Sequence, residues 1–144
     1  MRSIPVALAL VWVASICEAQ QPFRVEETTI AEVHAAMRAG TLTCRGLVEQ
    51  YLRRIDAYDK NGPGTNAIVV VNSNALRVAD SLDRRFAREG ITGPLHCIPV
   101  IVKDNFETVD LPTTAGSLSL QGFVSNKDAF QVKRIKGAGA VVLA

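Results

Sequence analysis

The sequence predicts a layered α/β fold in which helices pack against a central sheet with several parallel strands. Segments with helical periodicity alternate with short apolar segments, over distances that suit strand–helix–strand units. The 144 residues are 48% hydrophobic and 21% charged, an ordinary globular composition, and they suffice for one domain with a hydrophobic core. We therefore expect a single α/β domain that follows an N-terminal segment of a different kind.

That N-terminal segment, residues 1–19, has the layout of a cleavable secretory signal. Arg2 supplies a positive charge, residues 4–16 are predominantly apolar, and Ala19 is a small residue at the expected cleavage point. The apolar run is shorter than the roughly 20 residues of a membrane-spanning helix, so an uncleaved anchor is the less favoured alternative. We expect secretion, no stable membrane insertion after cleavage, and a mature domain over residues 20–144.

Two helices are expected to follow as a hairpin. Thr29 and Glu32 have the spacing of a capping box, and Gly40 is a suitable helix end. Thr43 can cap a second helix, which the Asn-Gly-Pro-Gly sequence at residues 61–64 ends. The expected apolar faces are Ile30, Val33, His34 and Met37 in the first helix and Leu47, Val48, Tyr51, Leu52, Ile55 and Tyr58 in the second.

A strand and a third helix are expected next. Residues 67–71 are short, rich in β-branched side chains and free of charge, which predicts a buried strand. Asn72 or Ser73 then caps a helix that ends at Gly90. The apolar face of this helix consists of Leu76, Ala79, Leu82 and Phe86.

The remainder alternates between strand and helix. After a Gly-Pro turn at residues 93–94, the sequence predicts a central buried strand over residues 98–102, a polar loop, a helix over about residues 128–136 and a strand over residues 140–143. The chain stops inside this last apolar segment, whereas chain ends are usually exposed. We expect it to be the front part of a longer protein.

Charge and cysteine content limit the classes of partner. The net charge is +2, and the basic cluster at residues 84–88 falls in a helical pattern, which indicates a solvated helix face and no nucleic-acid partner.

Removal of the signal leaves Cys44 and Cys97, which an oxidising compartment would allow to pair. Two cysteines so far apart are weak evidence for a bond, so we expect two buried thiols. With His34 and His96 they form no zinc-ligand pattern, and we expect no metal.

Lys103 is the residue with the clearest potential for chemistry. It ends the apolar run at residues 98–102, and desolvation there would disfavour its charged form. A neutral lysine can accept a proton from a hydroxyl nucleophile, and ligand sites of α/β sheets lie beyond the carboxyl ends of the strands. Spacing alone nevertheless favours a solvated turn at residues 103–105.

The flanking residues change that balance, because they resemble the lysine motif of the amidase signature family. The matching string is Gly93-Pro94-Leu95-His96-x-Ile98-Pro99-Val100-x-Val102-Lys103-Asp104-Asn105, followed by Thr113-Thr114-x-Gly116-Ser117, Asp128-Ala129, Val132 and Gly137-Ala138-Gly139-Ala140. The resemblance covers about residues 28–144. It implies the N-terminal part of a layered α/β/α fold with a central mixed sheet, and the hydrolysis of small-molecule amides without a cofactor.

The resemblance also implies a Ser–cis-Ser–Lys triad in which Lys103 is the base. The two serines of that triad belong to a Gly- and Ser-rich segment, and no such segment occurs up to Ala144. Ser117, Ser119 and Ser125 lie too close behind the lysine to take these roles. We therefore expect the N-terminal part of a secreted amidase, inactive by itself. The alternatives are a truncated or binding-only protein and a component of an amidotransferase, and the secretory signal argues against the latter.

Three further positions carry hypotheses of their own. Cys97 stands where the family commonly has glycine, and it is not expected to act as a nucleophile with His96, because neighbouring side chains on a strand point to opposite faces. We expect His96 to be a satisfied structural histidine. Asp104 is expected to hold the turn beside Lys103. Thr114 and Ser117 are candidate substrate-positioning residues, with ordinary turn capping as the alternative.

Overall fold

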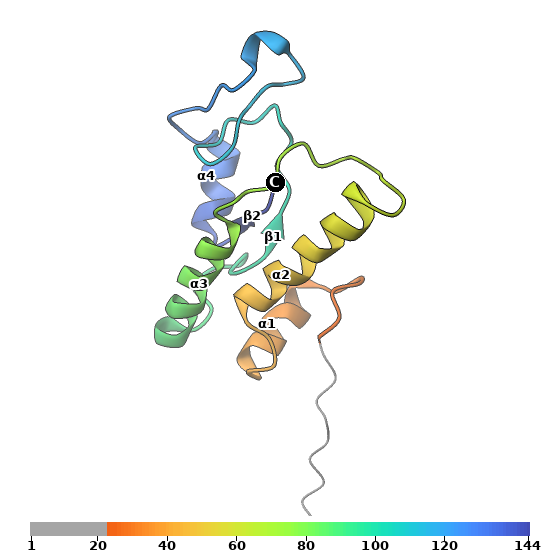
Figure 1. Ribbon diagram of the computed structural model, residues 1–144. Helices are drawn as coiled ribbons and strands as arrows, with labels where there is room; N and C mark the ends of the chain where they lie inside the picture. Colours follow the sequence, from red (N-terminus) through yellow and green to blue (C-terminus); the bar gives the residue numbers. More distant parts are fainter. Residues whose placement is uncertain (1–22) are drawn as a thin grey trace, which may run out of the picture.

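The computed structural model describes residues 23–144. The expected signal segment, residues 1–19, lies outside the described residues. The elements are α1 (Ile30–Arg38), α2 (Cys44–Arg54) with a π-helical extension (Ile55–Lys60), α3 (Ala75–Glu89), β1 (Pro99–Val100), a 3-10 turn (Leu118–Leu120), α4 (Phe130–Gly137) and β2 (Val141–Val142) (Figure 1). Within the described part, no helix combines the length and apolar character needed to cross a bilayer.

The start of both N-terminal helices follows the predicted capping. The Glu32 backbone N–H donates to Thr29 Oγ1 over 3.2 Å, and the Thr29 N–H donates to Glu32 Oε2 over 2.7 Å. Thr43 Oγ1 accepts a hydrogen bond from the Gly46 N–H over 3.0 Å at the start of α2. The buried side chains of α1 are Val33, His34 and Met37. The two helices and their caps are thus confirmed, whereas Ile30 and Tyr58, which were expected on the apolar faces, are exposed.

The predicted strand at residues 67–71 is wrong. The segment has no regular secondary structure and belongs to no sheet, and Val69 is 71% exposed. The cause is the buried carboxylate of Asp59, which accepts hydrogen bonds from the backbone N–H groups of Ala67 (2.6 Å) and Ile68 (3.3 Å) and from the Thr65 hydroxyl (2.9 Å). These contacts bind the segment to the end of the α2 extension, so its first donors are not available to a neighbouring strand.

Asn72 joins the start of α3 to the C-terminal strand. Its side-chain oxygen accepts a hydrogen bond from the Asn74 N–H (2.9 Å), and its side-chain amide donates to the Val142 carbonyl (2.8 Å). The helix itself begins later than predicted, since its N-cap is Asn74 and not Asn72 or Ser73. The predicted end at Gly90 is confirmed, with φ of 71° at that residue.

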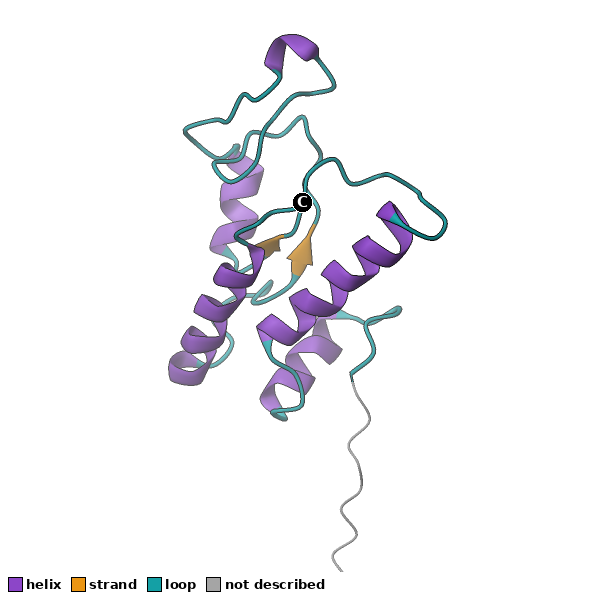
Figure 2. Ribbon diagram, in the orientation of Figure 1, coloured by secondary structure: helices purple, strands orange, loops and turns teal. Residues whose placement is uncertain are grey.

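The two strands are parallel neighbours, with Pro99 opposite Val141 and Val100 opposite Val142. Because α4 connects them, they form a strand–helix–strand unit, which confirms the α/β class (Figure 2). Hydrogen bonds between the two segments continue beyond Val142, from the Leu143 N–H to the Val100 carbonyl (2.8 Å) and from the Val102 N–H to the Ala144 carbonyl (2.8 Å). These bonds fix the direction in which the chain leaves the sheet.

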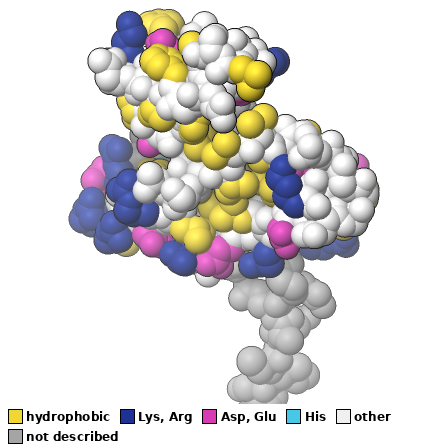
Figure 3. Space-filling model, turned by 45° about the horizontal axis from the view of Figure 1, so that its top comes forward, with side chains coloured by type: hydrophobic (Ala, Val, Ile, Leu, Met, Phe, Trp, Pro, Cys, Tyr) yellow, Lys and Arg dark blue, Asp and Glu magenta, His cyan; other side chains and the backbone are white. Residues whose placement is uncertain are grey.

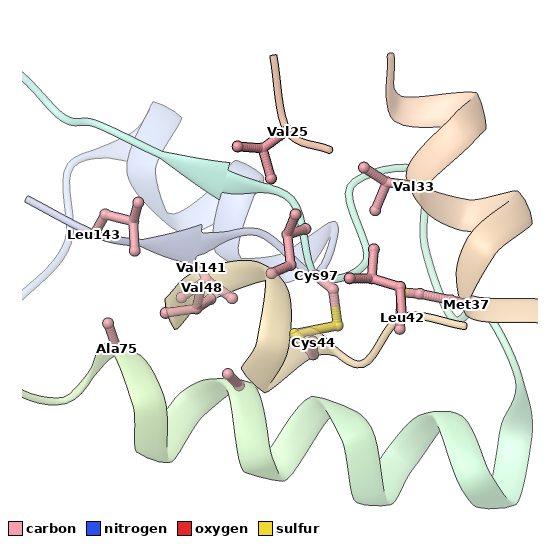
Figure 4. Close-up of a cluster of buried hydrophobic side chains, with 12 residues drawn as sticks. Val25, Val33, Met37, Leu42, Cys44, Val48, Ala75, Cys97, Val141 and Leu143 are labelled. Atoms are coloured by element: carbon pink, nitrogen blue, oxygen red, sulfur yellow. A yellow bond between two sulfur atoms is a disulfide. The ribbon is translucent and has the colours of Figure 1, made fainter. Parts of the chain in front are cut away.

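The hydrophobic core lies between the helices and the strands (Figure 4). It contains Val33, Met37, Leu47, Val48, Ala75, Ala79 and Val141. It also contains a disulfide between Cys44 and Cys97, whose Cα atoms lie 5.2 Å apart, so the expectation of two free thiols is wrong. The fold places the start of α2 against the turn before β1, a proximity that a separation of 53 residues in the sequence does not reveal.

Candidate active site

A groove of about 390 Å³ lies where the chain leaves the carboxyl ends of the two strands. We call it the Lys103 groove. Its lining is mostly apolar and consists of residues 67–70 on one side, residues 101–104 on the other, and Phe106, Thr108, Leu111, Pro112 and Ala144. The space-filling view shows hydrophobic side chains gathered across the middle of the molecule's upper face (Figure 3). The shape and lining suit a small ligand with an apolar part.

Lys103 lines this groove but is exposed, not desolvated. The expected buried strand at residues 98–102 is also only partly present, because β1 is half-buried and Ile101 is 61% exposed. The reason is that β1 has a single neighbouring strand in the described part of the chain, and no further layer there covers residues 101–103. The position of the lysine therefore agrees with the sequence prediction, whereas its predicted dehydration does not hold for this structure.

Asp104 organises the loop beside Lys103. Its carboxylate accepts hydrogen bonds from the Thr114 backbone N–H (2.6 Å) and the Thr114 hydroxyl, and its carbonyl accepts from the Ala115 N–H (2.9 Å). The Thr114 hydroxyl and N–H together lower the pKa of Asp104 below its ordinary value, because both bonds favour the ionised carboxylate. The expected role of Asp104 in the local turn is therefore visible in the structure.

The two candidate substrate-positioning residues lie outside the groove lining. Thr114 Oγ1 is occupied within the loop, since it also accepts a hydrogen bond from the Gly116 N–H (3.2 Å). Ser117 is exposed, and its hydroxyl lies 2.8 Å from that of Ser119. Lys103 and Asp104 thus line the groove, whereas Thr114 lies outside the lining and is hydrogen-bonded to Asp104.

A cluster that sequence reasoning missed anchors the other end of the same loop. Lys136 on α4 donates to both oxygens of Asp128 (2.9 and 3.1 Å) and to Asp110, and Asp128 also accepts from the Val109 N–H (3.0 Å). Burial acts to raise the pKa of Asp128, but the bonds from Lys136 and Val109 outweigh it and lower the pKa. The spacing of these residues in the sequence matches neither the helical nor the strand period, so it does not predict that they lie together.

His96 is fully buried in the turn before β1. Its Nδ1 lies 3.0 Å from Thr92 Oγ1, while its Nε2 has no hydrogen-bond partner among the described residues. The expectation of a satisfied histidine is therefore met at only one of the two ring nitrogens. Burial lowers the pKa of His96, and neighbouring His34 and Arg85 act in the same direction while Asp83 opposes them. The neutral ring has its proton on Nδ1 if it donates to Thr92, which leaves Nε2 as the bare nitrogen.

Comparisons with known proteins agree with the architecture. Residues 46–144 match the protein family described as Amidase. The native peptide amidase from Stenotrophomonas maltophilia is 44% identical, with a TM-score of 0.79, over 83% of this chain and 24% of that one. An amidase family protein from Bacillus anthracis is 36% identical, with a TM-score of 0.78, over the same shares. A glutamyl-tRNA(Gln) amidotransferase subunit from Alkalilimnicola ehrlichii is 40% identical over 83% of this chain and 24% of its own length.

These matches cover only part of each relative. The chain spans 21% to 24% of the length of the first curated relatives it matches. The family match over residues 46–144 contains Lys103 and both strands. The described residues have the α/β fold of the amidase-signature proteins, as the two solved structures show. The chain belongs to the amidase family.

Proposed function

We propose that this chain is the lysine-bearing N-terminal part of a secreted enzyme that hydrolyses carboxylic amides, with Lys103 as the catalytic base. The single observation that carries the proposal is the position of Lys103. It lies three residues beyond Val100, the carboxyl end of β1, and lines an apolar groove, within a string of residues that resembles the family's lysine motif.

The chemistry that fits this position is proton transfer to the side-chain amine of Lys103. In a Ser–cis-Ser–Lys triad, one serine hydroxyl attacks the amide carbonyl and its proton passes through the second serine to the neutral lysine. The same proton can then return to the departing amine. Lys103 is exposed here, so this scheme requires that further residues cover the Lys103 groove and bring the two serines to it. Relatives about four times as long as the matched region have the room for those residues.

Secretion is part of the proposal and has two supports. Residues 1–19 have the layout of a signal segment, and Cys44 and Cys97 form a disulfide, a bond that persists in oxidising compartments. Expression in a secreting host tests this directly. Mass spectrometry of the medium should find a protein that begins near Gln20, whereas an unprocessed protein retained inside the cells would contradict it.

Amide hydrolysis is tested by ammonia release from a panel of primary amides. The panel should include small aliphatic amides, aromatic amides and peptides with a C-terminal amide. The longer protein is expected to release ammonia from at least one of these classes, and the 144-residue chain alone is expected to release none. Hydrolysis by the 144-residue chain would contradict the proposed division of the triad, and an inactive longer protein would favour a binding-only role.

An amidotransferase role is the second candidate, because one group of relatives carries that name. A protein of that kind is expected to release ammonia efficiently only with its partner proteins and an acceptor present. Hydrolysis of amides by the purified longer protein alone distinguishes the two functions.

A further inference from the structure

The turn that leads into β1 packs closely against the residues that follow α4. A Cβ atom at Gly139 would lie 2.8 Å from His96 Cα, and one at Gly93 would lie 2.4 Å from the Ala138 carbonyl oxygen. The Cys97 N–H donates to the Gly139 carbonyl over 2.9 Å, and the His34 ring donates to the His96 carbonyl over 2.9 Å. Residues 93–98 are therefore held by contacts on both sides.

Cys97 has a backbone conformation that suits glycine. Its φ is 64°, in the left-handed region, where a Cβ atom crowds the backbone and glycine alone is accommodated without cost. The residue is fully buried, and it is bonded through sulfur to Cys44, which is fully buried as well. A covalent bond therefore occurs at the position in this turn where the backbone most needs an external constraint.

The other end of the bond is equally well fixed. Cys44 is the first residue of α2, and its backbone N–H donates to Asp83 Oδ1 over 2.7 Å. The Arg45 N–H donates to Asp83 Oδ2 over 2.9 Å, so a carboxylate from α3 caps the start of α2. The disulfide thus connects the turn before β1 to a point where two helices already meet (Figure 4).

We propose that the Cys44–Cys97 disulfide takes the place of a glycine in this turn: it holds residue 97 in the left-handed conformation and so positions β1 and, beyond it, Lys103. The bond constrains the backbone at residue 97. The Val141 N–H then donates to the Ile98 carbonyl (2.9 Å) and the Leu143 N–H to the Val100 carbonyl (2.8 Å), and these hydrogen bonds fix the path of the backbone between Cys97 and the Lys103 groove. The statement about Lys103 rests on the proposed function, while the statement about the turn does not.

The bond forms by exchange with a disulfide of an oxidoreductase or of a small oxidised thiol. One cysteine thiolate attacks that disulfide and displaces one thiol, and the second thiolate then attacks the mixed disulfide and displaces the other. Two protons leave the chain, and the acceptor gains the two electrons. Once formed, the bond is closed to reductants in the folded state, because both sulfur-bearing residues are fully buried.

The test compares glycine with alanine at position 97 in the absence of the bond. Cys44→Ala/Cys97→Gly and Cys44→Ala/Cys97→Ala differ by one methyl group, and their urea midpoints are compared with that of the oxidised chain. The glycine variant is expected to have the higher midpoint of the two variants, below that of the oxidised chain. Ala87→Gly, at an exposed position of helix α3, is the matched control, where the same exchange is expected to lower the midpoint.

Two outcomes would overturn the proposal. One is a midpoint for the alanine variant equal to or above that of the glycine variant, including failure of the glycine variant to fold. The other is alkylation of Cys44 and Cys97 in the folded chain over residues 20–144, which lacks Cys17, measured by intact mass after oxidative refolding. The expected result is no alkylation unless the chain is both unfolded and reduced.

The role toward Lys103 has a separate readout in the longer protein. If the bond positions Lys103, the kcat for amide hydrolysis should fall in the alanine variant and recover in the glycine variant, with KM little changed. Equal kcat values in the two variants would show that the bond does not position Lys103 and contributes to folding alone. An inactive wild-type enzyme would overturn the proposed function and leave the order of the urea midpoints as the measure of the turn.

Discussion

Asp104 and Thr114 are joined twice, since the same carboxylate accepts the backbone N–H and the hydroxyl of Thr114. The pair closes the loop that begins directly after Lys103. Because Ala115 and Gly116 follow with φ of 49° and 74°, the loop reverses sharply at this point. The position of Lys103 in the groove therefore depends on the carboxylate of the next residue, Asp104, and on the Thr114 hydroxyl, ten residues beyond Asp104.

Asp104→Asn tests this closure. An amide oxygen can still accept the Thr114 N–H, but the amide nitrogen cannot accept the hydroxyl, so a loss of about 1–2 kcal/mol in the free energy of unfolding is expected. The lowered pKa of Asp104 means that its contribution is present above its ordinary value of 3.8 and is lost as the pH falls through the lower folded value. Urea unfolding near neutral pH and in acid should show the difference between wild type and variant disappearing in acid. A difference that persists unchanged there would contradict this account.

His96 predicts a second pH dependence in a different range. The unfolded chain binds a proton at the ordinary pKa of 6.5, whereas burial lowers the pKa in the folded state, so the unfolded state binds more protons between the two values. The free energy of unfolding should therefore be highest above about pH 6.5 and decrease below it. His96→Gln should show a smaller decrease between about pH 7 and pH 5 in urea titrations. Identical slopes for the variant and the wild type would assign the effect to other groups.

Gly139 and Gly137 form a matched pair at the end of α4. An added methyl at Gly139 meets His96 Cα at 2.8 Å and sits at φ of 99°, whereas one at Gly137 meets nothing within 4 Å. Gly139→Ala is expected to lose about 2 kcal/mol or more of stability, and Gly137→Ala to be neutral or slightly stabilising in the helix. Thermal unfolding of both variants provides the measurement. Equal effects would show that the turn before β1 can move aside.

The sequence allowed the local features to be predicted because each depends on residues close together in the chain. The capping box of Thr29 and Glu32, the cap at Thr43 and the stop at Gly90 are all of this kind. The parallel direction of neighbouring strands was also predicted, since a helix between two apolar segments favours it, although the sequence did not identify which strands pair.

The errors have a common physical origin in contacts between distant residues. Residues 67–71 look like a strand by composition, but the Asp59 carboxylate takes their first donors. Nothing in the spacing of Cys44 and Cys97 reveals that the start of α2 meets the turn before β1. The dehydration expected at Lys103 requires a covering layer, which a pattern of apolar residues cannot supply.

The most direct test of the central claim is the rate of amide hydrolysis by the longer protein with Lys103→Ala. Lys127→Ala, at an exposed lysine outside the groove lining, is the matched control. If Lys103 is the base, kcat should fall by about 10²–10⁴-fold or more in Lys103→Ala, with the far-UV spectrum and unfolding midpoint unchanged, and remain near wild type in Lys127→Ala. Activity within a few-fold of wild type in a folded Lys103→Ala protein would contradict the account.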